Sequence, residues 1–568
     1  MKTYLSKLAL IVIFAFSGYL TSEACTNFLV TKSVSTDGST MITYAADSHV
    51  LYGELYYKPA ADYPKGAMLD VYEWDTGKYL GEIPQVRHTY SVTGNMNEHQ
   101  VSIGETTYGG REELAKKDTN AIMDYGSLMY ITLQRAKSAR EAIKVMTTLV
   151  DEYGYYSTGE SFSIADPNEV WILEIIGKGE YGPGAVWVAR KIPDGYVSAH
   201  ANQARIRTFP LAENNAASIT FSNINEIFNP DVETVYSDDV ISFARENDFY
   251  EGSDEDFSFS DTYAPMTFGG ARFCEVRVWS FFKDLHDDMD QYLDYVKGDE
   301  LDNRMPLWVK PNQKISARDM MNFMRDHLEE TDLDMRKDFG AGPFDRPYRW
   351  RPLTWEVDGE TYCNERATAT QQTGFSFVAQ ARNWLPDPVG GIFWFSVDDA
   401  ASTVYTPLYA GLQKAPATYA EGNGSMMEWS DNSAFWIFNQ VSNLAYTRYN
   451  LIHPYIHDLQ QELEKRYVQY TSMVDQEAEE LYKEDKQEAI EFVSDFSVDN
   501  ANSLVHKWKR FYQFLFMKFV DGNEKVTEGR EFQTNGTGVV RVEHPGYSDD
   551  WYKKLIEETG DKFKVPEN

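Results

Sequence analysis

The chain has few cysteines, and its basic residues are far outnumbered by acidic ones. Only three of its 568 residues are cysteine, Cys25, Cys274 and Cys363, which are too few and too far apart for a disulfide framework or a Cys-x-x-Cys metal site. Lysine and arginine number 53 and aspartate and glutamate 88, so the formal charge is −35. Because such a surface repels a polyanion, we expect no nucleic-acid partner.

Long hydrophobic runs are absent beyond the first residues. The run Leu8–Phe16 follows Lys2 and Lys7. It is too short for a bilayer, which takes about 20 helical residues to cross, and is typical of a secretory signal. The sequence therefore predicts a signal peptide over residues 1–24, export to the periplasm or the cell exterior, and no integral membrane segment after its removal.

The residue that follows this signal is a cysteine. Ser22 and Ala24 occupy the −3 and −1 positions of a signal-peptidase site before Cys25. Lipoprotein signals also end before a cysteine, but they usually carry an aliphatic residue at −3 and a small one at −2, where this chain has Ser22 and Glu23. As the new N-terminus, Cys25 would combine a thiol with an α-amine that can act as its base, as in N-terminal nucleophile enzymes.

The residues after Cys25 predict a β-hairpin. Thr26–Lys32 and Ser39–Ala45 are β-rich, and Asp37-Gly38 between them is a turn signal. If the turn is centred between Thr36 and Gly38, the residue numbers of paired positions on the two strands sum to about 73 to 75. This register places residues 48 to 50 opposite Cys25. Asp47 would then lie beside Cys25, either holding or orienting its amine or serving only as a residue of the strand end.

Further along, helical and strand patterns alternate. A capping box at Ser138 opens a helix that ends at Gly154. We expect a helix over residues 120–135, short strands over 162–165, 170–175, 185–189 and 197–201, an irregular acidic excursion over 214–261, a helix over 316–329 and a long ordered loop over 332–355. Beyond residue 420, Asp431 is the expected N-cap of a helix through Ala445, and two long amphipathic helices follow.

Several blocks together resemble the C69 family of dipeptidases, which are cysteine N-terminal nucleophile hydrolases. They are Cys25–Lys32, Asp37–Met41, Ala46–His49, Gly94–Glu98, Ile103–Thr107, Tyr153–Tyr155, Gly159–Ser161, Ile164–Asp166, Ser198–Ile206, Ala271–Phe273 and Val389–Phe395. The resemblance implies an α+β fold, with an αββα sandwich over residues 25–420. The polar stretch Glu421–Ser425 and the helical patterns after it predict a helical region over 421–568 that packs on the sandwich. It also implies hydrolysis of short peptides, especially dipeptides, with no metal or organic cofactor.

The candidate site residues follow from chemistry and from this resemblance. Cys25 is the nucleophile, and Asp47 is its candidate partner. The amide of Asn202 would donate to a developing oxyanion. Either Arg272 or Arg277, which flank Cys274, would face Cys25 and favour its thiolate, a choice that the sequence leaves open. Glu105 and Thr106 are candidate substrate-binding residues.

The sequence gives less support to other enzyme classes, and two alternative functions stay open. The chain has no Gly-x-Ser-x-Gly elbow, and His453 and His457 lack the glutamate of a zinc protease motif. An N-acyl amide hydrolase acting on bile salts or penicillins shares the nucleophile motif, and a lipid-anchored binding protein would use Cys25 only as an anchor. The sequence does not determine the oligomeric state.

Overall fold

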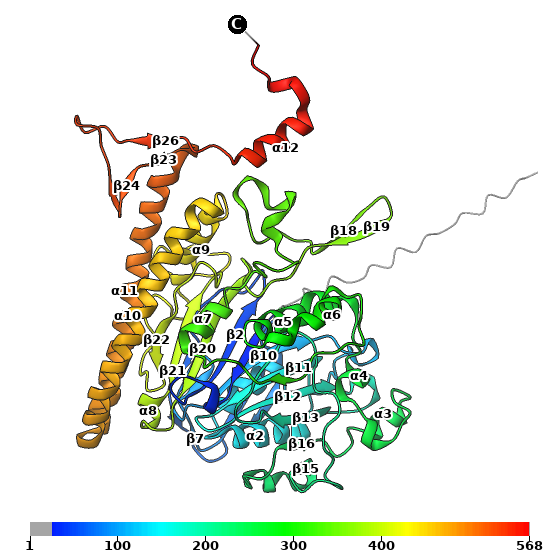
Figure 1. Cartoon of the computed structure of the whole chain (residues 1–568). Helices are drawn as coiled ribbons and strands as arrows, with labels where there is room; N and C mark the ends of the chain where they lie inside the picture. Colours follow the sequence, from blue (N-terminus) through cyan, green and yellow to red (C-terminus); the bar gives the residue numbers. More distant parts are fainter. Residues whose placement is uncertain (1–24, 567–568) are drawn as a thin grey trace, which may run out of the picture.

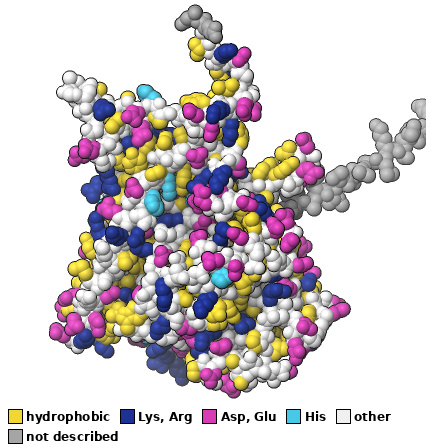
Figure 2. Space-filling model, viewed as in Figure 1, with side chains coloured by type: hydrophobic (Ala, Val, Ile, Leu, Met, Phe, Trp, Pro, Cys, Tyr) yellow, Lys and Arg dark blue, Asp and Glu magenta, His cyan; other side chains and the backbone are white. Residues whose placement is uncertain are grey.

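A computed structural model describes residues 25–566 of the chain. The predicted signal peptide lies outside the described residues. The fold is α+β, as expected: two large sheets with helices packed around them, and a C-terminal segment that extends away from the body (Figure 1). Acidic side chains are spread over the visible face and mixed with basic ones (Figure 2), in keeping with the negative net charge.

The first sheet contains the strand that follows Cys25, and all of its neighbouring strands are antiparallel. In spatial order its seven strands are β17 (Trp308–Val309), β14 (Val197–His200), β1 (Asn27–Val30), β2 (Thr40–Asp47), β20 (Thr373–Ala381), β21 (Ile392–Val397) and β22 (Thr406–Tyr409). β1 is therefore an inner strand, so Cys25 enters the fold inside the sheet and not at its edge.

The second sheet is antiparallel except for the pair β15–β16. In spatial order its nine strands are β15 (Ser218–Thr220), β16 (Thr234–Tyr236), β13 (Ala185–Lys191), β12 (Val170–Gly177), β11 (Gly159–Ala165), β10 (Ser102–Tyr108), β9 (Met96–Asn97), β8 (Val92–Thr93) and β3 (Tyr57–Lys58). β10 to β13 supply its long central strands.

The two sheets approach closely where β1 faces β10. A Cβ on Gly104 would lie 2.6 Å from Nδ2 of Asn27, so only glycine fits this position without displacing its neighbour. The Asn27 amide is also hydrogen-bonded to Ser163 of β11 at 3.1 Å. These contacts join the start of β1 to the centre of the second sheet.

Helices cover the outer faces of both sheets. α1 (Tyr125–Leu133) and α2 (Ala139–Tyr153) share a buried core with the second sheet. Ser138 caps α2 by accepting from Glu141 N, and Gly154 ends it at φ +73°, as the sequence predicts. The long helices α10 (Tyr449–Glu484) and α11 (Lys486–Phe519) bury their apolar stripes against the first sheet, where Tyr409 N donates to Ser497 Oγ at 3.0 Å.

The remaining helices are shorter. They are α3 (Ser242–Glu246), α4 (Phe259–Tyr263), α5 (Val276–Lys283), α6 (Leu293–Lys297), α7 (Ala317–Phe323), α8 (Asp387–Gly390), α9 (Ala434–Ala445) and α12 (Asp549–Thr559). None of the helices within residues 25–566 combines the length and the hydrophobicity that a bilayer crossing requires. The division of the chain at residue 420 stays a prediction.

Four local expectations are wrong. The hairpin pairs Leu29 with Ile42, which puts residue 46, not residues 48 to 50, level with Cys25, because a helical turn over Lys32–Val34 lengthens the connection. The acidic segment 214–261 contributes β15 and β16 to the second sheet. The helix expected over 316–329 ends at Phe323, and α9 is capped by Ser433 instead of Asp431.

Candidate active site

Cys25 lies at the buried beginning of β1, with 3% of its surface exposed. Its Sγ is 3.7 Å from the hydroxyl of Tyr44 and 3.7 Å from Oε1 of Glu105. The Tyr44 hydroxyl in turn donates to the same Glu105 oxygen. The thiol, the phenol and the carboxylate thus form one hydrogen-bonded group at the junction of the two sheets.

Arg277 holds the backbone around Cys25. Its guanidinium donates to the carbonyl oxygen of Cys25 at 2.6 Å and to the Thr26 hydroxyl at 2.8 Å. It also donates to Oδ1 of Asn202 at 2.9 Å. Burial and the nearby charge of Arg366 lower the pKa of Arg277 to about 10, which still leaves it charged at neutral pH. Of the two arginines that the sequence leaves open, Arg277 is the one that contacts Cys25.

Asn202 follows β14 in a left-handed backbone conformation, with φ at +59°. Asparagine tolerates this region better than most residues. Its amide nitrogen donates to the carbonyl of Thr107 at 2.7 Å, and its oxygen accepts from Arg277. These two bonds fix the orientation of the amide, which a hydrogen-bond donor to an oxyanion needs.

Asp47 is fully buried and bound to other residues. Arg366 pairs with its Oδ2 at 2.5 Å, and the Thr373 hydroxyl donates to its Oδ1 at 2.6 Å. Burial raises the pKa of Asp47, although Arg366 acts in the opposite direction. Each oxygen of Asp47 therefore accepts a hydrogen bond from a residue of the chain, and the role predicted for Asp47 beside Cys25 stays a prediction.

A second glutamate joins Glu105. Glu160 of β11 pairs with Thr107 of β10, so its side chain lies on the same face as that of Glu105. The Thr107 hydroxyl donates to Oε1 of Glu160 at 2.9 Å. Burial raises the pKa of Glu105 to about 6, and burial together with the charge of Glu105 raises the pKa of Glu160 well above its usual value.

Two sequence candidates are engaged elsewhere. Arg272 pairs with Glu365 and donates to the carbonyl of Lys297. The hydroxyl of Thr106 is hydrogen-bonded to Nδ1 of His200 at 2.7 Å, in the interior between the sheets. Burial lowers the pKa of His200 to about 3, so this contact is between neutral groups at neutral pH.

Sequence reasoning missed Tyr44, Glu160 and Arg366. Glu160 lies within one of the blocks that carry the family resemblance, but its proximity to Glu105 depends on the register of β10 and β11. Arg366 is 319 residues from Asp47 along the chain, and no local pattern connects the two.

An aromatic cavity of about 90 Å³ lies near this group. Tyr56, Trp74 and Tyr130 line it together with Phe375, whose ring packs edge-on against Tyr44 at 5.6 Å. Burial raises the pKa of Tyr130 well above its usual value, and the charges of Tyr56 and Glu105 act in the same direction. A larger hollow of about 640 Å³, lined partly by α2 and β13, contains none of the candidate site residues.

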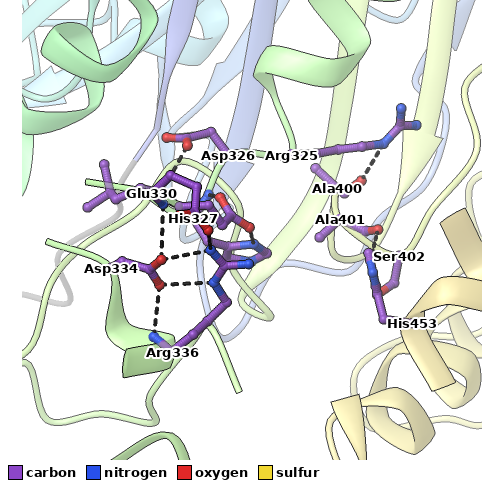
Figure 3. Close-up of polar contacts among 12 residues, drawn as sticks. Arg325, Asp326, His327, Glu330, Asp334, Arg336, Ala400, Ala401, Ser402 and His453 are labelled. Atoms are coloured by element: carbon purple, nitrogen blue, oxygen red, sulfur yellow. Dashed lines mark hydrogen bonds and ion pairs between the residues drawn. The ribbon is translucent and has the colours of Figure 1, made fainter. Parts of the chain in front are cut away.

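A separate polar group lies in the loop after α7 (Figure 3). We call His327, Glu329, Glu330, Asp334 and Arg336 the loop cluster. Both oxygens of Asp334 accept hydrogen bonds, from the backbone of Glu330 and from Arg336. Both oxygens of Glu329 accept bonds from His327. Across residues 25–566, no set of three or more histidine, cysteine, aspartate or glutamate side chains is arranged to hold a metal ion.

The comparisons with known proteins agree with a peptidase. A profile described as peptidase family C69 matches residues 24–462. The "Probable dipeptidase" of Latilactobacillus sakei is 25% identical over 446 residues, covering 75% of this chain and 82% of that protein. The "Probable dipeptidase B" of Streptococcus pyogenes serotype M1 is 23% identical over 516 residues, covering 88% and 94%. The chain belongs to peptidase family C69.

Proposed function

We propose that this peptidase is an exported dipeptidase that uses Cys25, exposed as the N-terminal residue by signal removal, as its nucleophile. Support comes from the buried group of Cys25, Tyr44 and Glu105 and from Arg277, which binds both the Cys25 carbonyl and Asn202. The relatives in Latilactobacillus sakei and Streptococcus pyogenes, both named as probable dipeptidases, support dipeptides as the substrate class.

The proposed reaction has two stages. The Cys25 α-amine takes the proton of the thiol as the sulfur attacks the scissile carbonyl carbon, and Asn202 donates to the oxyanion. The C–N bond breaks, the leaving amine takes the proton, and a thioester to Cys25 remains. Water then attacks the thioester, which releases the first amino acid and restores the thiol.

The fold is compatible with this mechanism. Two largely antiparallel sheets face one another, helices lie on their outer sides, and Cys25 begins an inner strand at their junction. This arrangement supports the N-terminal nucleophile hydrolase sandwich that the family resemblance implies. The proposed location is the periplasm or the cell exterior, because Lys2, Lys7 and the apolar run Leu8–Phe16 are typical of a secretory signal.

The observation that carries the proposal is the placement of the Cys25 thiol 3.7 Å from Glu105 and of its carbonyl on Arg277. N-terminal sequencing and intact mass of the mature protein test it first. We expect a chain that starts at Cys25 without a lipid. A diacylglycerol increment on Cys25, or a different first residue, would contradict it and favour the lipid-anchored alternative.

A further inference from the structure

A cavity of about 480 Å³ lies beyond the end of β2. Its walls come from residues just after β2, from the loop over residues 348–351, from the residues that lead into β20, and from α9. The described residues that line it include Arg351 and His49 but no aspartate or glutamate. In a chain with a formal charge of −35, an anion therefore meets no carboxylate on the walls of this cavity.

Arg351 brings a positive charge to the cavity that no carboxylate neutralises. Its Nε and Nη2 donate to Oε1 of Gln372 at 3.2 and 3.0 Å, and it forms no ion pair with an aspartate or glutamate of residues 25–566. A guanidinium stays charged at neutral pH. Burial lowers the pKa of Arg351 and the charge of Arg366 acts in the same direction, so positive charge is in excess at this place.

Gln372 adds a buried hydrogen-bond donor that has no acceptor. Its side chain also lines the cavity, and 4% of its surface is exposed. Its Oε1 accepts from Arg351, whereas its Nε2 has no partner among the described residues. A buried donor of this kind destabilises the fold unless a ligand or a water molecule accepts from it. A carboxylate would accept from Nε2 while its charge pairs with Arg351.

The cavity lies within reach of a substrate at Cys25. Residue 46 is level with Cys25, and Ser48, two residues further along, lines the cavity, so its wall begins about 7 Å from the level of Cys25. In the second residue of a dipeptide, the α-carboxylate carbon is less than about 4 Å from the scissile carbonyl carbon, but the side-chain carboxyl carbon of glutamate extends to about 6 Å. The side-chain carboxylate is therefore the group that reaches the cavity.

We propose that Arg351 and Gln372 bind the side-chain carboxylate of the second substrate residue, so that the enzyme prefers dipeptides that end in glutamate. This inference rests on the proposed function of Cys25. The first substrate residue does not suit this place, because Arg351 would repel its α-ammonium. Phe435 and Trp436 of α9 line the same cavity, and apolar walls that exclude water strengthen an ion pair.

Alanyl-glutamate and alanyl-glutamine test the proposal, because they have nearly the same shape and differ in the charge of the second side chain. We expect the wild-type enzyme to prefer alanyl-glutamate in kcat/KM by at least about 10-fold, and Arg351→Gln to lose most of this preference. Gln372→Glu, whose carboxylate would pair with Arg351 and repel that of the substrate, should remove the preference as well. Equal kcat/KM for both dipeptides in the wild-type enzyme would overturn the proposal, as would an unchanged preference in Arg351→Gln.

The matched control is Arg349→Gln, which removes a positive charge from the same loop. Arg349 pairs with Asp338 and does not line the cavity. We expect its preference to stay within about 2-fold of wild type. An equal loss of preference in Arg349→Gln and Arg351→Gln would overturn the proposal, because the preference would then follow the overall charge of the loop and not the cavity.

Binding to the Cys25→Ala variant separates this inference from the proposed function. Calorimetry should give a lower Kd for alanyl-glutamate than for alanyl-glutamine, without turnover. Equal Kd values in an inactive variant would refute the carboxylate site alone. Hydrolysis by Cys25→Ala would refute Cys25 as the nucleophile, and the Kd ratio would still report on Arg351 and Gln372. Glutarate that binds as tightly as alanyl-glutamate would assign the cavity to free dicarboxylic acids and overturn its role in substrate selection.

Discussion

The glutamates beside Cys25 and the loop cluster are both acidic, but their oxygens are satisfied differently. In the loop cluster, each oxygen of Asp334 and Glu329 accepts at least one hydrogen bond from a described residue. Beside Cys25, Glu105 accepts from the Tyr44 hydroxyl, Glu160 accepts from the Thr107 hydroxyl, and the two buried carboxyl groups are hydrogen-bonded to each other. His327 and backbone N–H groups hold the Glu329 carboxylate in its charged form, whereas burial of the glutamate pair favours the protonated form. The two groups should therefore respond in opposite ways to substitution.

The largest effect is expected at the thiol. Cys25→Ala should reduce kcat/KM for a dipeptide by at least about 10⁴-fold, because the proposed mechanism forms its thioester on the Cys25 sulfur. Its thermal unfolding should stay close to that of wild type. Cys274→Ala and Cys363→Ala, assayed in parallel, should remain active, and wild-type rates in Cys25→Ala would contradict the mechanism.

The two arginines provide the next test. Arg277→Lys should reduce kcat by about 10²-fold, because lysine cannot reproduce the planar fork that binds the Cys25 carbonyl, Thr26 and Asn202 at once. Arg272→Lys is the matched substitution five positions earlier in the chain; Arg272 contacts Glu365 and Lys297 instead, so this change should alter kcat by less than about 3-fold. Similar losses in both variants would argue against a specific role of Arg277.

Local patterns predicted much of the fold but little of the site's geometry. The alternation of apolar residues predicted β11 to β14, and Ser138 and Gly154 marked the ends of α2. The hairpin register was wrong because the helical turn over Lys32–Val34 has no strong sequence signal. β15 and β16 were missed because each is only three residues long and their buried hydrophobic residues, Ile219, Val235 and Tyr236, lie in a polar, acidic stretch of the sequence.

The contacts at the site that the sequence did not predict depend on the pairing of strands far apart in the chain. Cys25 and Asn202 were found from chemistry and resemblance, yet the partners of Asp47 and Glu105 depend on which strands meet. Glu160 lies 55 residues from Glu105 along the chain, and the pairing of Thr107 with Glu160 alone brings them together. The contact between these two buried carboxyl groups was therefore visible only in three dimensions.

Breaking the loop cluster should affect stability and not catalysis. Asp334→Asn leaves Arg336 and two backbone N–H groups with weaker acceptors. We expect a loss of about 1 to 3 kcal/mol in the free energy of unfolding, measured by urea denaturation, with kcat per folded molecule unchanged. Asp338→Asn, a more exposed aspartate of the same loop, is the control. A fall in kcat with unchanged stability would contradict a purely structural role of the loop cluster.

The smallest effect is a difference in pH dependence between the two groups. The pKa of Glu105 is raised by burial to about 6, so the folded state binds its proton more tightly and stability falls as pH rises from about 4.5 to 6. The pKa of Glu329 is lowered to about 2, where its bonds with His327 outweigh burial, so stability rises as pH rises from about 2 to 4.5. Relative to wild type, Glu105→Gln should thus gain about 1 to 2 kcal/mol between pH 4 and pH 7, whereas Glu329→Gln should lose stability between pH 3 and pH 5. Urea denaturation across pH 3 to 7 measures how the stability of each variant, relative to wild type, changes with pH. Changes of the same sign in both variants would contradict the opposite pKa shifts of Glu105 and Glu329.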